Sequence, residues 1–365
     1  MRFPRFALAV AIAAAWGPAS GADLLSIYRD SLVSDAAYQA ARAQYEATRE
    51  RLPQARAGYL PLINGSATAF RNDINLEIAP DQRYSTSTYA VTLTQPVFRM
   101  QNWIAISQAD KVVIQAQTTL YREAQELILR VSQTYFDVLL AQDNVALSGA
   151  QKTAIAEQLA QAKRNFEVGT STIVDTLEAQ ARYDQSVAKE ILDLNELEVR
   201  KRLLTVILNK LPDSFLPLRE PLRLAEPSPN NIEEWVKVAS DASYQVQVAR
   251  AGLEIAKEEV DRQRAGHYPT VDLSASYANA YDPSNSISGV VKPNVKNGVV
   301  GLTLSVPIFA GGLTQSRVRE AVALRDRAAQ DLENTQRIVS QTVRQQFLNV
   351  TSTIAQVRAL EQALA

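Results

Sequence analysis

The sequence predicts a mainly α-helical protein with some β-structure, and three observations lead to this fold class. Residues 102–168 contain no proline and a single glycine, Gly149, so they are expected to form one very long helix. Four segments alternate between apolar and polar residues, which is typical of β-strands. The order of helix, strand pair and long helix occurs twice, so we expect an internal two-fold repeat.

The N-terminal residues have the features of a secretory signal peptide. Arg2 and Arg5 form a basic region, residues 6–16 form an apolar stretch, and residues 20–22 form a small-residue cleavage site. The apolar stretch is shorter than the roughly 20 residues that a membrane-spanning helix needs. We therefore expect residues 1–22 to be removed on export.

The composition argues against several classes of function. The chain has 365 residues, no cysteine and one histidine, His267, so neither disulfides nor metal clusters of His and Cys can form. A net charge of −1 without a basic tract argues against binding to nucleic acid. Because no acid, base and nucleophile converge anywhere, we expect neither an enzyme nor a cofactor.

Two pairs of motifs define the repeat. RAGYLP matches RAGHYP at a shift of 208 residues, and TLTQPVF matches TLSVPIF at a shift of 211 residues. The matched positions include Gly58 with Gly266, Pro61 with Pro269, and Pro96 with Pro307.

The repeat divides the mature chain into three predicted parts. The first repeat, residues 23–210, is expected to hold a helix (23–57), a β-hairpin at about 62–95, a long helix, a tip turn and another helix. Residues 211–230 form a proline-rich linker. The second repeat, residues 231–365, is expected to hold a helix (231–265), a β-hairpin at about 271–306 and a long helix, and to be incomplete.

The predicted strands are two-faced, with small polar residues on one face and apolar residues on the other. A length of about 9–11 residues suits a tilted transmembrane strand, but the same alternation occurs in soluble antiparallel sheets. If the strands enter a membrane, several copies must combine, because about eight strands are needed to close a barrel. The apolar sets are Ile63, Ala67 and Ala69; Tyr89, Val91 and Leu93; Val271, Leu273, Ala275, Tyr277 and Tyr281; and Val300, Leu302, Leu304 and Val306.

The long helices have the pattern of coiled coils. Ala124, Val131, Val138 and Val145 recur at seven-residue spacing within residues 102–168. Because the apolar stripe is narrow, we expect these helices to pack side by side around a wet interior.

The segment FEVGTSTIVD carries the signals of a tight reversal between two helices. Gly169 suits the left-handed position just after a helix, and Thr172 with Asp175 has the form of a capping box for the next helix. This spacing alone indicates no more than an αα-hairpin.

The mature chain resembles the TolC family of outer-membrane efflux channels over nearly all of its length. The segments that carry this resemblance are, in order, RAGYLP, TQPVF, FEVGTSTIVD, RAGHYPT and SVPIFAGG. The resemblance implies a homotrimer, in which each chain gives four strands to a 12-stranded β-barrel in outer-membrane lipid. The helices would then form a periplasmic α-barrel, with residues 211–230 as an equatorial belt. It further implies docking with a periplasmic adaptor (a membrane fusion protein) and an inner-membrane RND or ABC transporter, for efflux of small molecules or type I protein secretion.

The resemblance also assigns roles to individual residues. Gln158 and Asp175 match residues that link the outer helices of the periplasmic aperture to a Tyr and an Arg on the inner helices, although Val174 replaces a frequent threonine. The turn that would contact the adaptor is Phe166, Val168, Gly169, Thr170 and Ser171. The expected strand–helix bends are Pro61, Pro96, Pro269 and Pro307.

A second tip turn is expected near residue 377, a shift of 211 from Phe166, so the chain is expected to be C-terminally truncated. The alternative to a channel is a soluble periplasmic coiled-coil adaptor. An adaptor would need one hairpin and lipoyl-like or sandwich segments, whereas two strand pairs occur at matched repeat positions.

Overall fold

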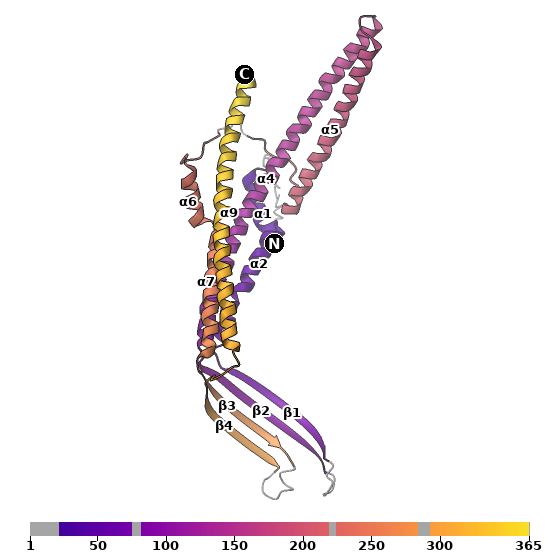
Figure 1. The fold of residues 1–365 in the computed structure, drawn as a ribbon. Coiled ribbons are helices and arrows are strands. Elements are labelled where there is room, and N and C mark those ends of the chain that lie inside the picture. Colours follow the sequence, from indigo (N-terminus) through magenta and orange to yellow (C-terminus); the bar gives the residue numbers. More distant parts are fainter. Residues whose placement is uncertain (1–21, 75–81, 219–223, 284–292, 365) are drawn as a thin grey trace, which may run out of the picture. The chain divides into compact units, whose positions relative to one another are not determined.

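The computed structural model describes residues 22–74, 82–218, 224–283 and 293–364 (Figure 1). The chain divides into two compact units, one formed by Met1–Ala40 and Glu123–Leu224 and the other by Ala41–Arg122 and Ala225–Ala365. Most elements are helices and the strands form one sheet, which confirms the predicted mainly α fold with some β-structure. The predicted signal peptide lies outside the described residues, apart from Ala22.

The first unit is built on α1 (Leu24–Ser34), the end of α4 (Met100–Glu167) and α5 (Ile173–Leu208). α4 has 68 residues, a length on the order of 100 Å at about 1.5 Å per residue. Val131 and Val138, two members of the seven-residue ladder, are fully buried. The core cluster consists of Ile27, Leu127, Val131, Tyr135, Leu139, Leu204, Ile207 and Leu208.

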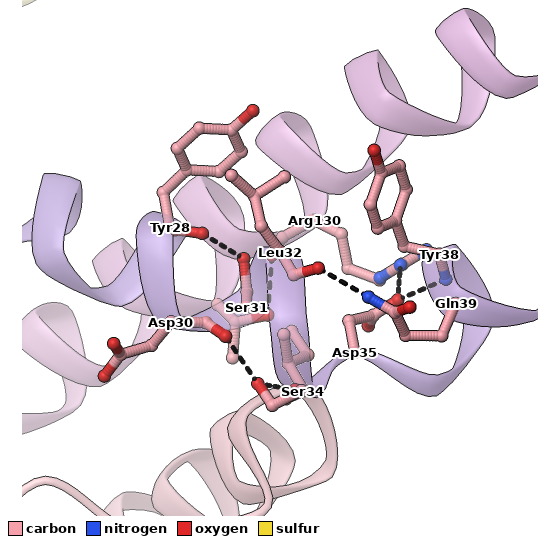
Figure 2. A network of polar contacts seen from close by, with 11 residues as sticks. Tyr28, Asp30, Ser31, Leu32, Ser34, Asp35, Tyr38, Gln39 and Arg130 are labelled. Carbon is pink, nitrogen blue, oxygen red and sulfur yellow. Dashed lines mark hydrogen bonds and ion pairs between the residues drawn. The ribbon is translucent and has the colours of Figure 1, made fainter. Parts of the chain in front are cut away.

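The expectation of one helix over residues 23–57 is wrong, because the chain forms α1, α2 (Ala36–Arg49) and α3 (Arg51–Ala57). The break before α2 lies at Asp35, whose backbone is extended. Its carboxylate Oδ1 accepts hydrogen bonds from the backbone N–H of Tyr38 at 2.7 Å and from Nη2 of Arg130 at 2.9 Å (Figure 2). Asp35 therefore starts α2 and forms an ion pair with α4, and it is only 4% exposed.

The helices of the second unit differ from prediction in the same way. Instead of one helix over 231–265, the chain forms α6 (Ile232–Ala242), α7 (Tyr244–Arg264) and the short 3₁₀ turn η1 (Ala265–His267). The break lies at Ser243, which is extended. α9 (Leu313–Leu364) packs along α6 and α7 (Figure 1). Arg344 of α9 forms an ion pair with Glu233 of α6 at 3.0 Å.

The sheet lies in the second unit and contains β1 (Leu62–Ile74), β2 (Gln82–Phe98), β3 (Thr270–Tyr281) and β4 (Asn294–Ser305). Its order is β1-β2-β3-β4, and all three pairings are antiparallel (Figure 1). β1 and β4 therefore form the two edges. No helix within the described ranges combines the length and apolar character needed to cross a membrane.

The four prolines expected at strand–helix bends occupy different places. Pro61 and Pro269 directly precede β1 and β3, and Pro307 lies two residues after β4. Pro96, in contrast, lies inside β2, where the register with β3 shifts between Pro96 and Phe98. A proline cannot donate a ladder hydrogen bond, and such an irregularity accommodates it within the strand.

Candidate functional site

The turn between α4 and α5 is a tight reversal that closes one end of the first unit. Gly169 has a φ of +77°, the left-handed conformation expected just after a helix. Its N–H donates to the carbonyl of Phe166 at 3.0 Å, and the N–H of Thr170 donates to that of Asn165 at 2.9 Å. This pair of bonds is a Schellman motif, which satisfies carbonyl groups at the end of α4.

The predicted capping box at the start of α5 is present. The N–H of Asp175 donates to Oγ1 of Thr172 at 3.3 Å, and the N–H of Thr172 donates to Oδ2 of Asp175 at 2.8 Å. The hydroxyl of Thr172 also donates to Oδ2 at 2.8 Å. These donors, first the backbone N–H and then the hydroxyl, hold the pKa of Asp175 below its ordinary value.

The structure brings Gln158 and Asp175 together. Both line a shallow hollow of about 210 Å³ between α4 and α5. The same hollow is lined by Glu178 and Arg182, which form an exposed ion pair at 2.6 Å. The sequence interpretation missed these two residues, although their spacing of three and seven residues from Asp175 places them on the same face of α5. The hollow is therefore lined by acidic side chains, a basic side chain and the amide of Gln158.

Large apolar side chains are exposed around the turn. Phe166 and Val168 belong to the predicted contact turn, and both are exposed. Ile173, Val174 and Leu177 at the start of α5 are exposed as well, and the sequence motifs point to Val174 alone among them. The end of this hairpin therefore offers an apolar surface beside a polar hollow, a combination that is common in protein interfaces.

The sheet is a second candidate surface, and its register separates the two kinds of side chain. Leu93 of β2 lies opposite Ile63 of β1 and Ala275 of β3, and Ala275 lies opposite Val300 of β4. The other face carries hydroxyl groups: Thr94 of β2 lies opposite Ser274 of β3, and Thr92 of β2 lies opposite Ser276 of β3. Much of the apolar face is exposed to solvent, and Val300 is 77% exposed. An apolar face this exposed indicates an apolar environment or a partner.

A polar cluster joins the helical end of the sheet to the start of α4. The guanidinium of Arg99 donates two hydrogen bonds to the carboxylate of Asp272, at 2.8 and 2.7 Å. Nearby, Nε2 of Gln95 donates to the carbonyl of Tyr59 at 2.5 Å, and Nδ2 of Asn102 donates to that of Gly58 at 2.5 Å. A two-bond Arg–carboxylate pair fixes both distance and orientation. No local pattern indicates this pair, because its members lie 173 positions apart.

Within the part of the chain that the structure describes, no group of three or more His, Asp or Glu side chains could hold a metal ion. The two candidate surfaces are thus an αα-hairpin end suited to protein contact and a two-faced sheet with an exposed apolar side.

Comparison with known proteins gives concordant matches over nearly the whole chain. The family model described as "Outer membrane efflux protein" matches residues 27–210 and 235–365. The chain is 31% identical over 360 residues to the outer membrane protein TolC of Vibrio cholerae, covering 97% of this chain and 81% of that protein. It is 30% identical over 354 residues to the alkaline protease secretion protein AprF of Pseudomonas aeruginosa, covering 93% of this chain and 72% of that protein.

Solved structures show the same fold. The crystal structure of the Campylobacter jejuni CmeC outer membrane channel superposes with a TM-score of 0.75 and covers 93% of this chain and 74% of that chain. The sequence identity to it is 15%, so this likeness concerns the fold.

Proposed function

Because the chain belongs to the outer membrane efflux protein family, we propose that three copies form a conduit across the outer membrane, each copy giving four strands to a 12-stranded barrel. The chain itself is an outer-membrane channel protein of the class that serves efflux or type I secretion. Its relatives include one that is named for the secretion of alkaline protease. The alternative of a soluble periplasmic adaptor is not favoured, and we propose no enzymatic role.

The observation that carries this proposal is the two-faced sheet with two open edges. The apolar face suits lipid, and the hydroxyl-rich face suits a water-filled lumen. In the hydrocarbon of a membrane, unpaired backbone groups at β1 and β4 cost several kcal/mol each, so the edges need partners. Pairing between copies supplies those partners and leaves no edge once the sheet closes.

The helices extend this conduit into the periplasm in the proposed arrangement. Residues 23–210 and 231–365 act as the two repeats, and residues 211–230 act as the equatorial linker between them. Residues 1–22 direct export and are removed.

The αα-hairpin end is proposed to meet the periplasmic adaptor, which links the channel to an inner-membrane RND or ABC transporter. Phe166 and Val168 offer apolar contact, and Gly169, Thr170 and Ser171 form the turn itself. Gln158 and Asp175, in their shared hollow, are proposed to hold neighbouring helices at the closed aperture. Since Oδ2 of Asp175 already accepts bonds from Thr172, its other oxygen is the one available for a partner helix.

The two faces of the sheet provide the test. Val300→Arg places a charge on the apolar face, where it costs about 2–4 kcal/mol in a bilayer core. We expect this variant to be depleted from the outer-membrane fraction. The matched control, Thr92→Arg, places the same charge on the hydroxyl-rich face, and we expect it to insert normally and to change single-channel conductance in planar bilayers.

Equal insertion of the two variants, or loss of Thr92→Arg alone, would contradict the assignment of the faces to lipid and lumen. Retention of the native protein in the periplasmic fraction would contradict the proposed conduit itself.

A further inference from the structure

The apolar face of the sheet changes in character along its strands. In the middle of the sheet it is apolar, as where Ala275 lies between Leu93 and Val300. Two rows further along, polar side chains share this face, in a row formed by Ala67, Tyr89, Asn279 and Lys296. This row lies towards the end of the sheet that is away from the helices (Figure 1). The same face therefore carries both an apolar part and a polar border.

A hollow of about 490 Å³ lies on the apolar face beside this border, over β1, β2 and β3. Its lining includes two small residues of β1, Gly65 and Ala67, and an added Cβ at Gly65 meets nothing within 4 Å. Tyr89 and Tyr277 also line it, and they are 62% and 54% exposed. A concave surface of small and aromatic residues with few polar groups suits a flexible hydrocarbon chain.

Lys296 places a cation at the polar border of this hollow. It lies directly opposite Asn279, which lines the hollow, and its side chain is exposed. No described residue forms an ion pair with it, whereas Arg83 on the same face pairs with Asp73 at 3.0 Å. A cation of this kind beside an apolar hollow is complementary to a molecule that combines an anionic group with a hydrocarbon chain.

The position of Lys296 along β4 agrees with the border of a bilayer. Eight residues separate it from Leu304, the last apolar-face residue of the strand, which is about 26 Å of extended chain. At the tilt of about 35–45° found in outer-membrane strands, this length covers about 20 Å of an apolar band about 25 Å tall. Because the lysine stem is long and flexible, its ammonium can reach the headgroups at that border.

We propose that this part of the sheet binds one lipid of the outer leaflet, with its anionic phosphate headgroup paired to Lys296 and one acyl chain in the hollow. The amide of Asn279 and the hydroxyl of Tyr89 share the row of Lys296 and donate to the phosphate oxygens. This inference rests on the proposed function. Because the helices extend into the periplasm in that arrangement, the opposite end of the sheet meets the outer leaflet.

Native mass spectrometry of the protein in detergent micelles tests the headgroup contact. Equal amounts of phosphatidylglycerol and phosphatidylcholine with the same acyl chains are added, and the first lipid that each chain binds is identified. We expect the native protein to prefer phosphatidylglycerol about fivefold, the factor that one lysine contributes near an anionic surface. Lys296→Gln should bind the two lipids alike.

Arg71→Gln is the matched control for charge. Arg71 is an exposed cation on the same face that pairs with no described residue, but it lies four residues beyond Ala67, about 13 Å further along β1. The substitution changes the net charge by the same amount as Lys296→Gln. We expect this variant to keep the preference for phosphatidylglycerol.

Filling the hollow tests the acyl-chain contact. Gly65→Ile adds an apolar side chain where there is free space, at a position whose backbone is not left-handed. We expect both lipids to bind about threefold more weakly, because packing contacts alone hold a chain that comes from a micelle. The matched control is Gly298→Ile, which lies in the row of Gly65 and on the same face but does not line the hollow. It should bind both lipids as the native protein does.

Several results would overturn the lipid site. Equal binding of the two lipids by the native protein, or a loss of preference in Arg71→Gln as large as that in Lys296→Gln, would show that no headgroup is held at Lys296. Displacement of the lipid by millimolar inorganic phosphate would assign Lys296 to free phosphate. Unchanged binding by Gly65→Ile would show that no acyl chain occupies the hollow.

Membrane fractionation separates the failure of this inference from the failure of the proposed function. Native protein that is recovered in the outer-membrane fraction but shows no lipid preference overturns the lipid site and leaves the conduit standing. Native protein that is recovered in the periplasmic fraction overturns the conduit and the lipid site together.

Discussion

Two helix breaks, at Asp35 and at Ser243, show how one backbone feature can be built with different chemistry. Asp35 has φ −68° and ψ 115°, and Ser243 has φ −60° and ψ 126°. Each N–H donates to the carbonyl four residues earlier, at 2.9 and 3.0 Å. The side chains differ, since Asp35 caps α2 and pairs with Arg130 while Ser243 makes no capping hydrogen bond.

This difference indicates that the backbone break does not depend on the ion pair. Ser243 adopts the same conformation with a small neutral side chain, and at a shift of 211 residues Gln341 occupies the position that corresponds to Arg130. The Asp35–Arg130 pair is therefore an addition to a break that forms without it. Its contribution is to fix the junction between α1 and the start of α2 against α4 in the first unit.

The largest expected effect comes from breaking the ion pair on one side. Arg130→Gln leaves the carboxylate of Asp35, only 4% exposed, without its cation. Because an uncompensated buried charge is costly, we expect the free energy of opening of α1 and α2 to fall by about 2–4 kcal/mol. Native-state hydrogen exchange of amides 24–49 measures this quantity.

The double variant Asp35→Ser with Arg130→Gln is the matched control, because it installs the chemistry found at Ser243 and Gln341. We expect it to be less destabilised than the sum of the two single variants by about 1–3 kcal/mol. Strict additivity would mean that the pair makes no coupled contribution.

A smaller effect, a gain in the stability of the first turn of α7, is expected from adding the missing cap at Ser243. Ser243→Asp places a carboxylate three residues before Val246, as Asp35 lies three residues before Tyr38. We expect the amides of the first turn of α7 to gain about 0.5–1 kcal/mol of protection, because Asp is a strong N-cap residue. Ser243→Asn separates hydrogen bonding from charge and should retain most of the gain. No gain from either variant would show that the backbone there cannot accept a cap.

The start of α5 has a capping box without an ion pair, so it shows the effect of capping by itself. Of the three helix starts, we expect its loss to change the smallest number of amides. Thr172 is the N-cap of α5, and Asp175 completes the capping box by accepting from the N–H of Thr172; among the described residues Asp175 forms no ion pair. Because its pKa is lowered in the folded state, its contribution is fully present above its unfolded pKa of about 3.9 and is lost as pH falls through the folded pKa. We expect exchange protection of amides 172–176, corrected for intrinsic rates, to be constant from pH 5 to 8 and to fall below about pH 4.

Asp175→Asn should remove this pH dependence, because the amide does not titrate. The same acid loss in that variant would assign the effect to another group.

The features that sequence could predict are those set by neighbouring residues. The Schellman turn at Gly169 and the capping box of Thr172 and Asp175 are local, and both were predicted and found. The faces of the strands followed from alternation, because a strand has a side-chain period of two.

The features that sequence did not predict depend on distant contacts. The break at Asp35 contains neither proline nor glycine, and its cation lies 95 positions away. Pro96 was expected to end its strand, yet β2 continues to Phe98 because the register shift absorbs the missing donor. The shared hollow of Gln158 and Asp175 depends on the pairing of α4 with α5, and the roles of both residues remain proposals.

Because the register of the sheet is regular, an odd or even residue number indicates which of the two faces a residue lies on. Odd-numbered positions in β1, β2 before its shift, and β3 lie on the apolar face, together with even-numbered positions in β4. A spectroscopic label moved one residue at a time should therefore alternate between the two faces. For the same reason a strand can accept inserted residues only in pairs, because a single one would exchange the faces of every position that follows it.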